Sequence, residues 1–230
     1  MSKLELGMRR ITLMLLALVL LMGCSNTSDF DDMTVRAGHE VAGRPLAEYA
    51  NIWWQWTYTM PKELSPVADR TGENCHQGQQ GDVWFLAGGY GPSRISRKCT
   101  IPLGKYVFFP VINMVHYPAR DSAPSCERVK EAAALNNDEL LSIFIELDGV
   151  SSVNSKDYRL SSPDCFDLLG MLPRDANAPK LYPSASDGYW VMLKPLEKGK
   201  HLLKFRAQYD RENGAYGKAV QDIQYEIMVE

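Results

Sequence analysis

The stretch VWFLAGGYGPSRISRKCTIPLGKYVFFPVIN, residues 83–113, decides the fold of this chain. It is the densest apolar and aromatic run after residue 24, and glycines and prolines divide it into short pieces. The pieces 83–87 and 106–112 have the length and the β-branched or aromatic content of buried strands, whereas 94–100 alternates less clearly. Turn residues at 88–92 and 102–104 separate the three pieces. Pro110 predicts that its strand lies at a sheet edge or carries a bulge.

The C-terminal segments predict an antiparallel sheet with one buried and one solvated face. In the segment 201–209 the apolar residues alternate with polar ones, and the segment 223–229 repeats this pattern up to the C-terminus; the residues of the buried face are Leu203, Phe205, Ala207, Tyr209, Ile223, Tyr225, Ile227 and Val229. Residues 142–147, 158–160 and 188–194 are further predicted strands.

Two segments predict helices. Residues 46–60 follow Pro45, which a first helical turn tolerates, and they carry apolar residues at helical spacing. Within this helix we expect Trp53 and Trp56 to pack in the core and Trp54 to be only partly buried. Residues 126–141 form the second predicted helix, with a possible break at 136–137, and 163–183 is a long loop. The chain is therefore predicted to be mainly β, an antiparallel sandwich or jelly-roll-like fold with an N-terminal helix and one inserted helical segment.

The N-terminus predicts export and a lipid anchor. The residues MRR at 8–10 precede an apolar run, 11–20, that is short for a membrane span. The run ends in LMGC at 21–24, which resembles a bacterial lipobox with cleavage before Cys24 and acylation of its thiol. An ordinary signal peptide or an uncleaved anchor is the alternative. We expect a signal peptide over 1–23, a flexible tether over 24–43 and one globular domain over 44–230. Ser25, in place of Asp, favours the outer membrane, with the domain in the periplasm or at the surface.

The charge of the chain argues against nucleic acid as a partner. The sequence has 25 Lys and Arg against 28 Asp and Glu. Removal of residues 1–23 takes away three of the cations and one of the anions, which leaves a net charge of −5 and no basic run. The expected partners are the membrane, through the lipid anchor alone, and a small molecule or an envelope protein.

Apart from Cys24, the chain has four cysteines, Cys75, Cys99, Cys126 and Cys165. An even number in an exported chain predicts two disulfides. Three pairings are possible, and the sequential pairing closes the shortest loops. A zinc site is the rival interpretation, but the cysteines lack the close spacing of zinc ligands. We therefore expect neither a metal nor a cofactor.

Aromatic residues beside polar ones at strand ends predict a binding module. Such residues can stack against sugar rings or other flat apolar faces while amides and carboxylates hold polar groups. The candidates are Trp54, Trp84, Tyr90, Asn113, His116, Asp187 and Trp190. The alternative is a periplasmic hydrolase that uses loop carboxylates such as Glu73, Asp82 and Asp187. An envelope interaction protein without a small ligand is a third possibility, and no catalytic residue can be assigned.

Four blocks of sequence resemble a family of exported bacterial proteins and lipoproteins. The blocks are WWQW at 53–56, TGENCHQGQQGDVWFLAG at 71–88, KCTIPLGKYVFFPVIN at 98–113 and DGYWVMLKPLEKGKH at 187–201. The resemblance implies export and a single domain, but it implies no activity. The expected lipid anchor rests on Cys24 and not on this resemblance.

Overall fold

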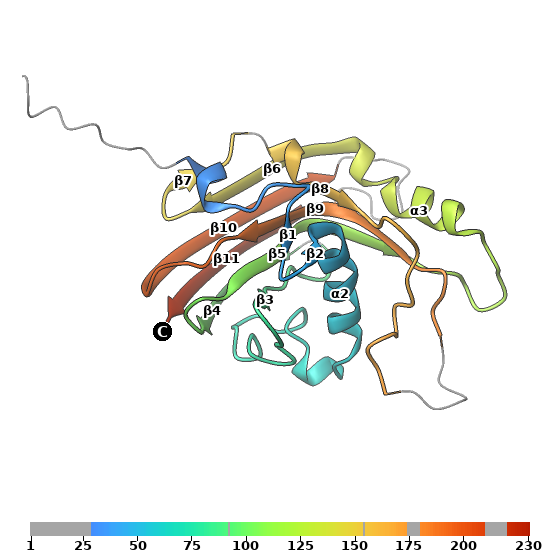
Figure 1. Ribbon diagram of the computed structural model, residues 1–230, viewed down its shortest axis with the longest axis horizontal. Helices are drawn as coiled ribbons and strands as arrows, with labels where there is room; N and C mark the ends of the chain where they lie inside the picture. Colours follow the sequence, from blue (N-terminus) through green and yellow to red (C-terminus); the bar gives the residue numbers. More distant parts are fainter. Residues whose placement is uncertain (1–28, 92, 154, 174–179, 210–219) are drawn as a thin grey trace, which may run out of the picture.

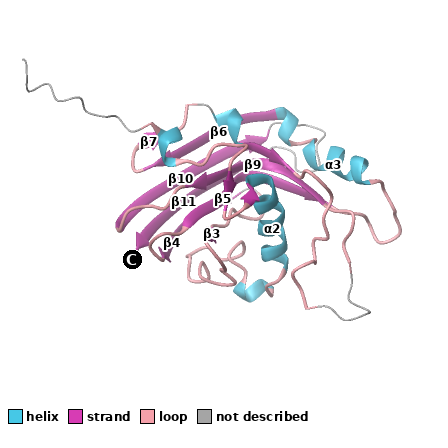
Figure 2. Cartoon of the chain, viewed as in Figure 1, coloured by secondary structure: helices cyan, strands magenta, loops and turns pink. Residues whose placement is uncertain are grey.

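The computed structural model describes residues 29–91, 93–153, 155–173, 180–209 and 220–230. Two β-sheets pack face to face, and a helix, α2 (Leu46–Tyr58), lies against the outer face of one of them (Figures 1 and 2). The larger sheet has the strand order β4-β11-β10-β6-β7, and the smaller has the order β3-β5-β9-β8. The predicted mainly β sandwich with few helices is therefore confirmed.

The larger sheet contains β4 (Ser93–Ile101), β11 (Val220–Val229), β10 (Gly199–Tyr209), β6 (Leu140–Leu147) and β7 (Val150–Ser151). The smaller sheet contains β3 (Val83–Phe85), β5 (Tyr106–His116), β9 (Ala185–Leu193) and β8 (Arg159–Ser161). A short hairpin, β1 (Glu40–Val41) and β2 (Arg44–Pro45), precedes α2. The other helical elements are α3 (Cys126–Ala134) and the 3-10 turns η1 (Phe30–Met33), η2 (Lys62–Leu64), η3 (Asn137–Glu139) and η4 (Ser155–Tyr158).

Each sheet contains one parallel strand pair, which the expectation of antiparallel sheets missed. Strand β4 runs parallel to β11, and β3 runs parallel to β5. The other strand pairs of both sheets are antiparallel. Alternation of apolar and polar residues shows which face of a strand is buried, but it does not show the direction of its neighbour.

The poorly alternating segment of the opening stretch forms β4, whose side chains alternate strictly between buried and exposed. The sequence hides this pattern because two of the inward positions are polar, Ser93 and Arg97. Strands β10 and β11 have the predicted inward faces, and Phe205 packs on Phe109 of the opposite sheet with ring centroids 4.8 Å apart. This contact lies in the main core between the two sheets.

Strand β9 is buried along its whole length because both of its faces are covered. Tyr189 and Val191 face the core between the sheets, whereas Trp190 and Met192 face α2. The smaller sheet is thus the middle layer of three. A strand with two buried faces loses the alternation of apolar and polar residues, and for this reason residues 189–193 of β9 form an apolar run.

Helix α2 carries the three tryptophans as expected. Trp53 and Trp56 are buried, and their indole N–H groups donate to the carbonyls of Leu86 and Gln77, each at 2.9 Å. Trp54 is only partly buried. The helix begins after Pro45 and ends at Tyr58, two residues before the predicted end.

The disulfides follow the sequential pairing, Cys75–Cys99 and Cys126–Cys165. The first joins the loop before β3 to the middle of β4. The second joins the start of α3 to the loop between β8 and β9. Both bonds therefore attach long irregular segments to regular structure.

The predicted tether over 24–43 is wrong for part of its described residues, because Phe30, Thr34 and Val41 are buried against the domain. Phe30 is completely buried and meets the ring of Tyr158 edge-on at 6.2 Å. The N–H of Val35 donates to the carbonyl of Met192 at 2.8 Å, so this segment continues the smaller sheet beside β9. Burial and a hydrogen bond to Asp31 raise the pKa of Tyr158 to about 12. The polar composition of the segment concealed the single phenylalanine that anchors it.

The signal peptide and Cys24 lie outside the described residues. Within the described ranges, no helix has the length and apolar character needed to cross a membrane. The predicted helix 126–141 is broken at 136–137 as expected, and its last residues belong to β6. The predicted bulge is also present, between Pro110 and Ile112 of β5.

Candidate functional site

A groove lies where β5 ends, between α2 and the turn that follows β3. Its volume is about 260 Å³, which suits one ring or a short segment of chain. Its lining side chains are mostly aromatic or uncharged polar, and we call it the aromatic groove. The lining residues are Trp53, Trp54, Thr57, Tyr58, Val67, Gly88, Gly89, Tyr90, Gly91, Ile112, Asn113, Met114, Val115, Tyr117, Tyr209 and Gln221.

Helix α2 supplies one wall of the aromatic groove. Trp54 and Tyr58 are four residues apart, so they lie one above the other on the same side of the helix. Trp54 meets the buried ring of Trp53 edge-on at 5.1 Å, and Tyr58 meets Tyr117 in the same way at 6.4 Å. Because Trp53 is bound to the carbonyl of Leu86, the position of this wall is tied to the sheet.

The turn at 88–91 forms the opposite wall, and side chains from distant strands hold it. Gln221 of β11 accepts from the N–H of Gly89 at 2.9 Å and donates to the carbonyls of Gly89 and Gly91, each at 2.8 Å. A Cβ on Gly89 would lie 2.5 Å from the hydroxyl of Ser93, so the turn needs glycine at this position. This network fixes the main chain beside Tyr90.

Arg97 of β4 reinforces the same wall from inside the protein. Its guanidinium donates to the carbonyls of Ala87 and Gly88 at 2.7 and 2.9 Å, and to those of Asp69 and Val67 at 2.8 and 3.3 Å. It also donates to the hydroxyl of Tyr225 at 2.9 Å. The side chain is 1 % exposed, and no carboxylate of the described residues lies within ion-pair distance of it.

Two hydrogen-bond donors in the lining of the aromatic groove have no acceptor among the described residues. They are the indole Nε1 of Trp54 and the amide Nδ2 of Asn113, and both atoms are buried. A buried donor without a partner costs about 1–3 kcal/mol. Most buried polar groups in proteins are satisfied, so two such donors on residues that line one hollow favour an acceptor from outside the described part of the chain.

Three of the seven predicted binding residues, Trp54, Tyr90 and Asn113, line the aromatic groove. Trp84 and Trp190 do not, because they are core residues. Trp190 is 1 % exposed and stacks on Phe108 at 5.3 Å, and Trp84 is buried between the sheets. Neither has a free face for a ligand, contrary to expectation. His116 is exposed at the end of β5 and is not among the lining residues.

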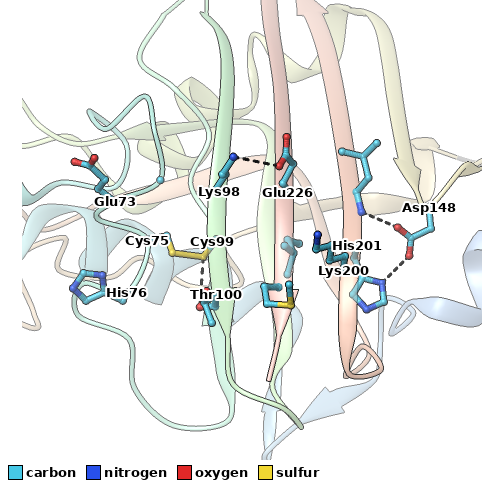
Figure 3. A pocket seen from close by; sticks show the side chains of 14 residues that line it. Glu73, Cys75, His76, Lys98, Cys99, Thr100, Asp148, Lys200, His201 and Glu226 are labelled. Carbon is cyan, nitrogen blue, oxygen red and sulfur yellow. Dashed lines mark hydrogen bonds and ion pairs between the residues drawn. A yellow bond between two sulfur atoms is a disulfide. The ribbon is translucent and has the colours of Figure 1, made fainter.

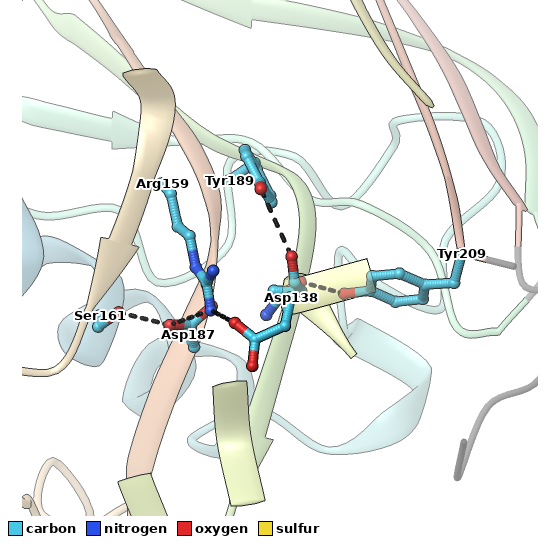
Figure 4. Close-up of polar contacts among 7 residues, drawn as sticks. Asp138, Arg159, Ser161, Asp187, Tyr189 and Tyr209 are labelled. Atoms are coloured by element: carbon cyan, nitrogen blue, oxygen red, sulfur yellow. Dashed lines mark hydrogen bonds and ion pairs between the residues drawn. The ribbon is translucent and has the colours of Figure 1, made fainter. Parts of the chain in front are cut away.

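Asp187, the remaining candidate, is held in a buried ion pair at the edge of the smaller sheet (Figure 4). Its carboxylate accepts from Arg159 at 3.1 and 3.3 Å and from the hydroxyl of Ser161. Arg159 also donates to Asp138 at 2.7 Å. Burial alone would lower the pKa of Arg159, but its bonds to Asp138 and Asp187 outweigh this effect and raise it. These contacts give the cluster a structural role.

A larger hollow of about 780 Å³ lies on the outer face of the larger sheet (Figure 3). It is lined mainly by charged and polar side chains, many of them paired with each other. Lys98 lies 3.8 Å from Glu226, and His201 lies 2.7 Å from Asp148. None of the unpartnered buried side-chain atoms of the described residues belongs to its lining. The aromatic groove is therefore the better candidate despite its smaller volume.

Sequence reasoning missed Tyr58, Tyr117 and Gln221, which complete the aromatic groove. Tyr58 could have been found, because it lies one helical turn after Trp54. Nothing in the sequence connects Gln221 with the turn at 88–91, since 130 residues separate Gln221 from Gly91. Among the described residues, no group of three or more His, Cys, Asp or Glu side chains could hold a metal ion.

No protein-family model, curated protein or solved structure matches the chain. The resemblance to exported bacterial proteins stays an expectation from the four sequence blocks.

Proposed function

We propose that the chain is an envelope lipoprotein whose folded domain binds an uncharged envelope component in the aromatic groove. One observation carries the proposal. Trp54 and Asn113, which carry buried donors without a described partner, both line a hollow whose walls are otherwise aromatic, apolar or uncharged. A ligand with a flat or apolar face and an acceptor oxygen would satisfy these donors and cover the rings.

The lining of the aromatic groove favours binding over hydrolysis. None of its described residues is an acid, a histidine, a lysine, a serine or a cysteine, the residue types that most often serve as nucleophile or general base. Glu73, Asp82 and Asp187, the carboxylates considered for a hydrolase, do not line this groove. Glu73 lines the hollow on the outer face of the larger sheet, and Asp187 is ion-paired with Arg159.

The first described residues after the proposed anchor and the aromatic groove lie at opposite ends of the smaller sheet. Thr34 bridges to Leu193 at one end of β9, and the groove residues Asn113 and Val115 pair with the other end, at 186–188. Cys24 precedes Asp29 by five residues, which span at most about 18 Å. The seven residue steps from 186 to 193 add about 23 Å along β9. A domain anchored through Cys24 would therefore present its groove away from that lipid.

The binding test is a thermal-shift screen of the full-length chain in mild detergent against neutral oligosaccharides, peptidoglycan fragments and uncharged peptides. A ligand present at 100 times its Kd stabilises the folded state by about 2.7 kcal/mol. Trp54→Phe keeps an aromatic ring but removes the N–H, and we expect it to weaken a hit about fivefold. Tyr182→Ala is the control, because Tyr182 is exposed and does not line the groove. A screen with no hit, or a hit that Trp54→Phe leaves unchanged, contradicts the proposal.

The anchor is tested separately by metabolic labelling with a radioactive fatty acid. We expect label on the wild-type chain and none on a Cys24→Ser variant, which should also leave the membrane fraction. Labelling that survives the substitution would exclude Cys24 as the acylated residue.

A further inference from the structure

The outer edge of β5 is only partly covered by another strand. Strand β3 pairs with the first three residues of β5, and the last bond between these segments runs from the N–H of Leu86 to the carbonyl of Phe108 at 2.9 Å. The chain then turns away through 88–91 towards β4. No strand of the described residues pairs with 112–115 on this side of β5, so these residues lie along an open edge of the described sheet, and all four of them line the aromatic groove.

The direction of the main-chain groups along this edge follows from the register with β9. The carbonyls of Ser186 and Met192 accept bonds from Ser162 and Val35, on the side of β9 away from β5. The main-chain N–H and C=O groups of successive residues in a strand point to opposite sides. The N–H and C=O groups of residues 186, 188, 190 and 192 therefore all point away from β5. Their partners on β5, among them Asn113 and Val115, therefore turn their own N–H and C=O groups outward.

Two further observations agree with this assignment. Gly188, the partner of Asn113, lies so close that a Cβ on it would be 2.7 Å from the Cβ of Asn113, as expected for a close pair without mutual hydrogen bonds. Pro110, which has no N–H, occupies an outward position opposite Trp190. No described residue forms a main-chain hydrogen bond with the outward groups of Asn113 or Val115.

We propose that the ligand of the aromatic groove is an extended, uncharged polypeptide segment that adds to the smaller sheet beside residues 112–116 of β5. This inference rests on the proposed function and names its ligand class. Adding a strand satisfies the outward main-chain groups of Asn113 and Val115 in the way that one strand satisfies another. A sugar offers no row of donors and acceptors at strand spacing.

The walls of the aromatic groove determine the chemistry of that segment. Trp54, Tyr58 and Tyr117 can pack against alternate apolar side chains of a bound strand. A charged side chain would lose its hydration without gaining a counter-ion, because the described lining is uncharged. The Trp54 and Asn113 donors require an acceptor, which a carbonyl or an uncharged polar side chain provides.

The probe is a pool of end-blocked synthetic octapeptides in which Val, Leu or Tyr alternates with Ser, Thr or Asn. Binding to the full-length chain in mild detergent is measured by fluorescence polarisation, with a neutral N-acetylated oligosaccharide tested in parallel. Val115→Pro removes one outward N–H without removing a bond to β9, and Val115→Ala is the matched control. We expect Val115→Pro to weaken the tightest peptide about tenfold or more, and Val115→Ala to have a smaller effect.

A second measurement does not depend on how well a proline variant folds. The tightest peptide is resynthesised with N-methyl groups on its odd or on its even residues and tested on the wild-type chain. Pairing with β5 predicts that one series loses binding at least about tenfold and the other keeps it. Equal effects in both series would overturn the inference. Binding of the oligosaccharide alone would also overturn it while leaving the proposed function intact, and binding of neither probe would count against both.

Discussion

Arg97 gives the sharpest prediction about what holds the aromatic groove together. Arg97→Met keeps a long side chain but removes the charge and all five hydrogen bonds. The carbonyl of Ala87 keeps a bond from the hydroxyl of Tyr225, whereas those of Val67, Asp69 and Gly88 lose the only described donor. At about 1–3 kcal/mol for each buried carbonyl, the loss is roughly 3–9 kcal/mol.

An opposing effect reduces this loss. A guanidinium that is buried without a carboxylate has a desolvation cost of several kcal/mol, which the methionine does not have. We therefore expect Arg97→Met to lower the free energy of unfolding by about 3 kcal/mol. For a domain of about 200 residues this corresponds to a fall in Tm of about 6–12 °C. Arg97→Lys should recover little of the loss, because an ammonium cannot reach the same set of carbonyls.

The assay is urea unfolding of the full-length chain with its disulfides intact, followed by tryptophan fluorescence. Arg94→Met is the control, since Arg94 lies on the exposed face of the same strand with its side chain 86 % accessible. If Arg97→Met is within about 1 kcal/mol of the wild type, the carbonyl network is not what stabilises this wall. If Arg97→Lys restores full stability, the positive charge stabilises this wall and the several N–H donors of the guanidinium are not needed.

Three further outcomes are expected, all measured by urea or thermal unfolding. Phe30→Ala should cost about 3–5 kcal/mol, because the ring is completely buried; a loss below 1 kcal/mol would mean that the segment is a tether after all. Asp187→Asn should cost about 2 kcal/mol by leaving Arg159 without its buried partner, and an unchanged Tm would contradict the structural role of this pair. Burial would lower the pKa of His201, but its bonds to Asp148 and the carbonyl of Glu197 raise it above 6.5. Its contribution to stability should be complete below pH 6.5 and should disappear as the pH rises through the raised pKa; His201→Gln should remove this dependence, and equal pH profiles would contradict it.

Local patterns predicted most of the elements and few of the contacts between them. The alternation in β10 and β11 and the spacing in α2 each follow from one face meeting the core, so each can be read within one segment. Arg97 shows the limit of this approach. An arginine interrupts the apolar pattern of β4, and its inward position is possible because carbonyls of two other segments, at 67–69 and 87–88, accept from its guanidinium.

In the candidate site, too, local patterns predicted some residues correctly and could not predict which side chains are buried. Trp54, Tyr90 and Asn113 were found because aromatic and amide side chains beside turns are typical of binding sites. Trp84 and Trp190 have the same chemistry and similar sequence surroundings, yet they are buried. Whether a tryptophan faces a ligand or the core depends on what covers its strand, and the covering element is encoded elsewhere in the chain.

The sequence by itself determined the predominance of β-structure, the main strands and helices, and the expectation of export with two disulfides. These properties depend on composition and on the spacing of neighbouring residues. The tertiary structure alone decided the parallel pairs, the inward Arg97, the packed N-terminal segment and the open edge of β5. Each of these depends on which other segment of the chain lies alongside, and burial and hydrogen bonding between separate segments leave no mark in a local pattern.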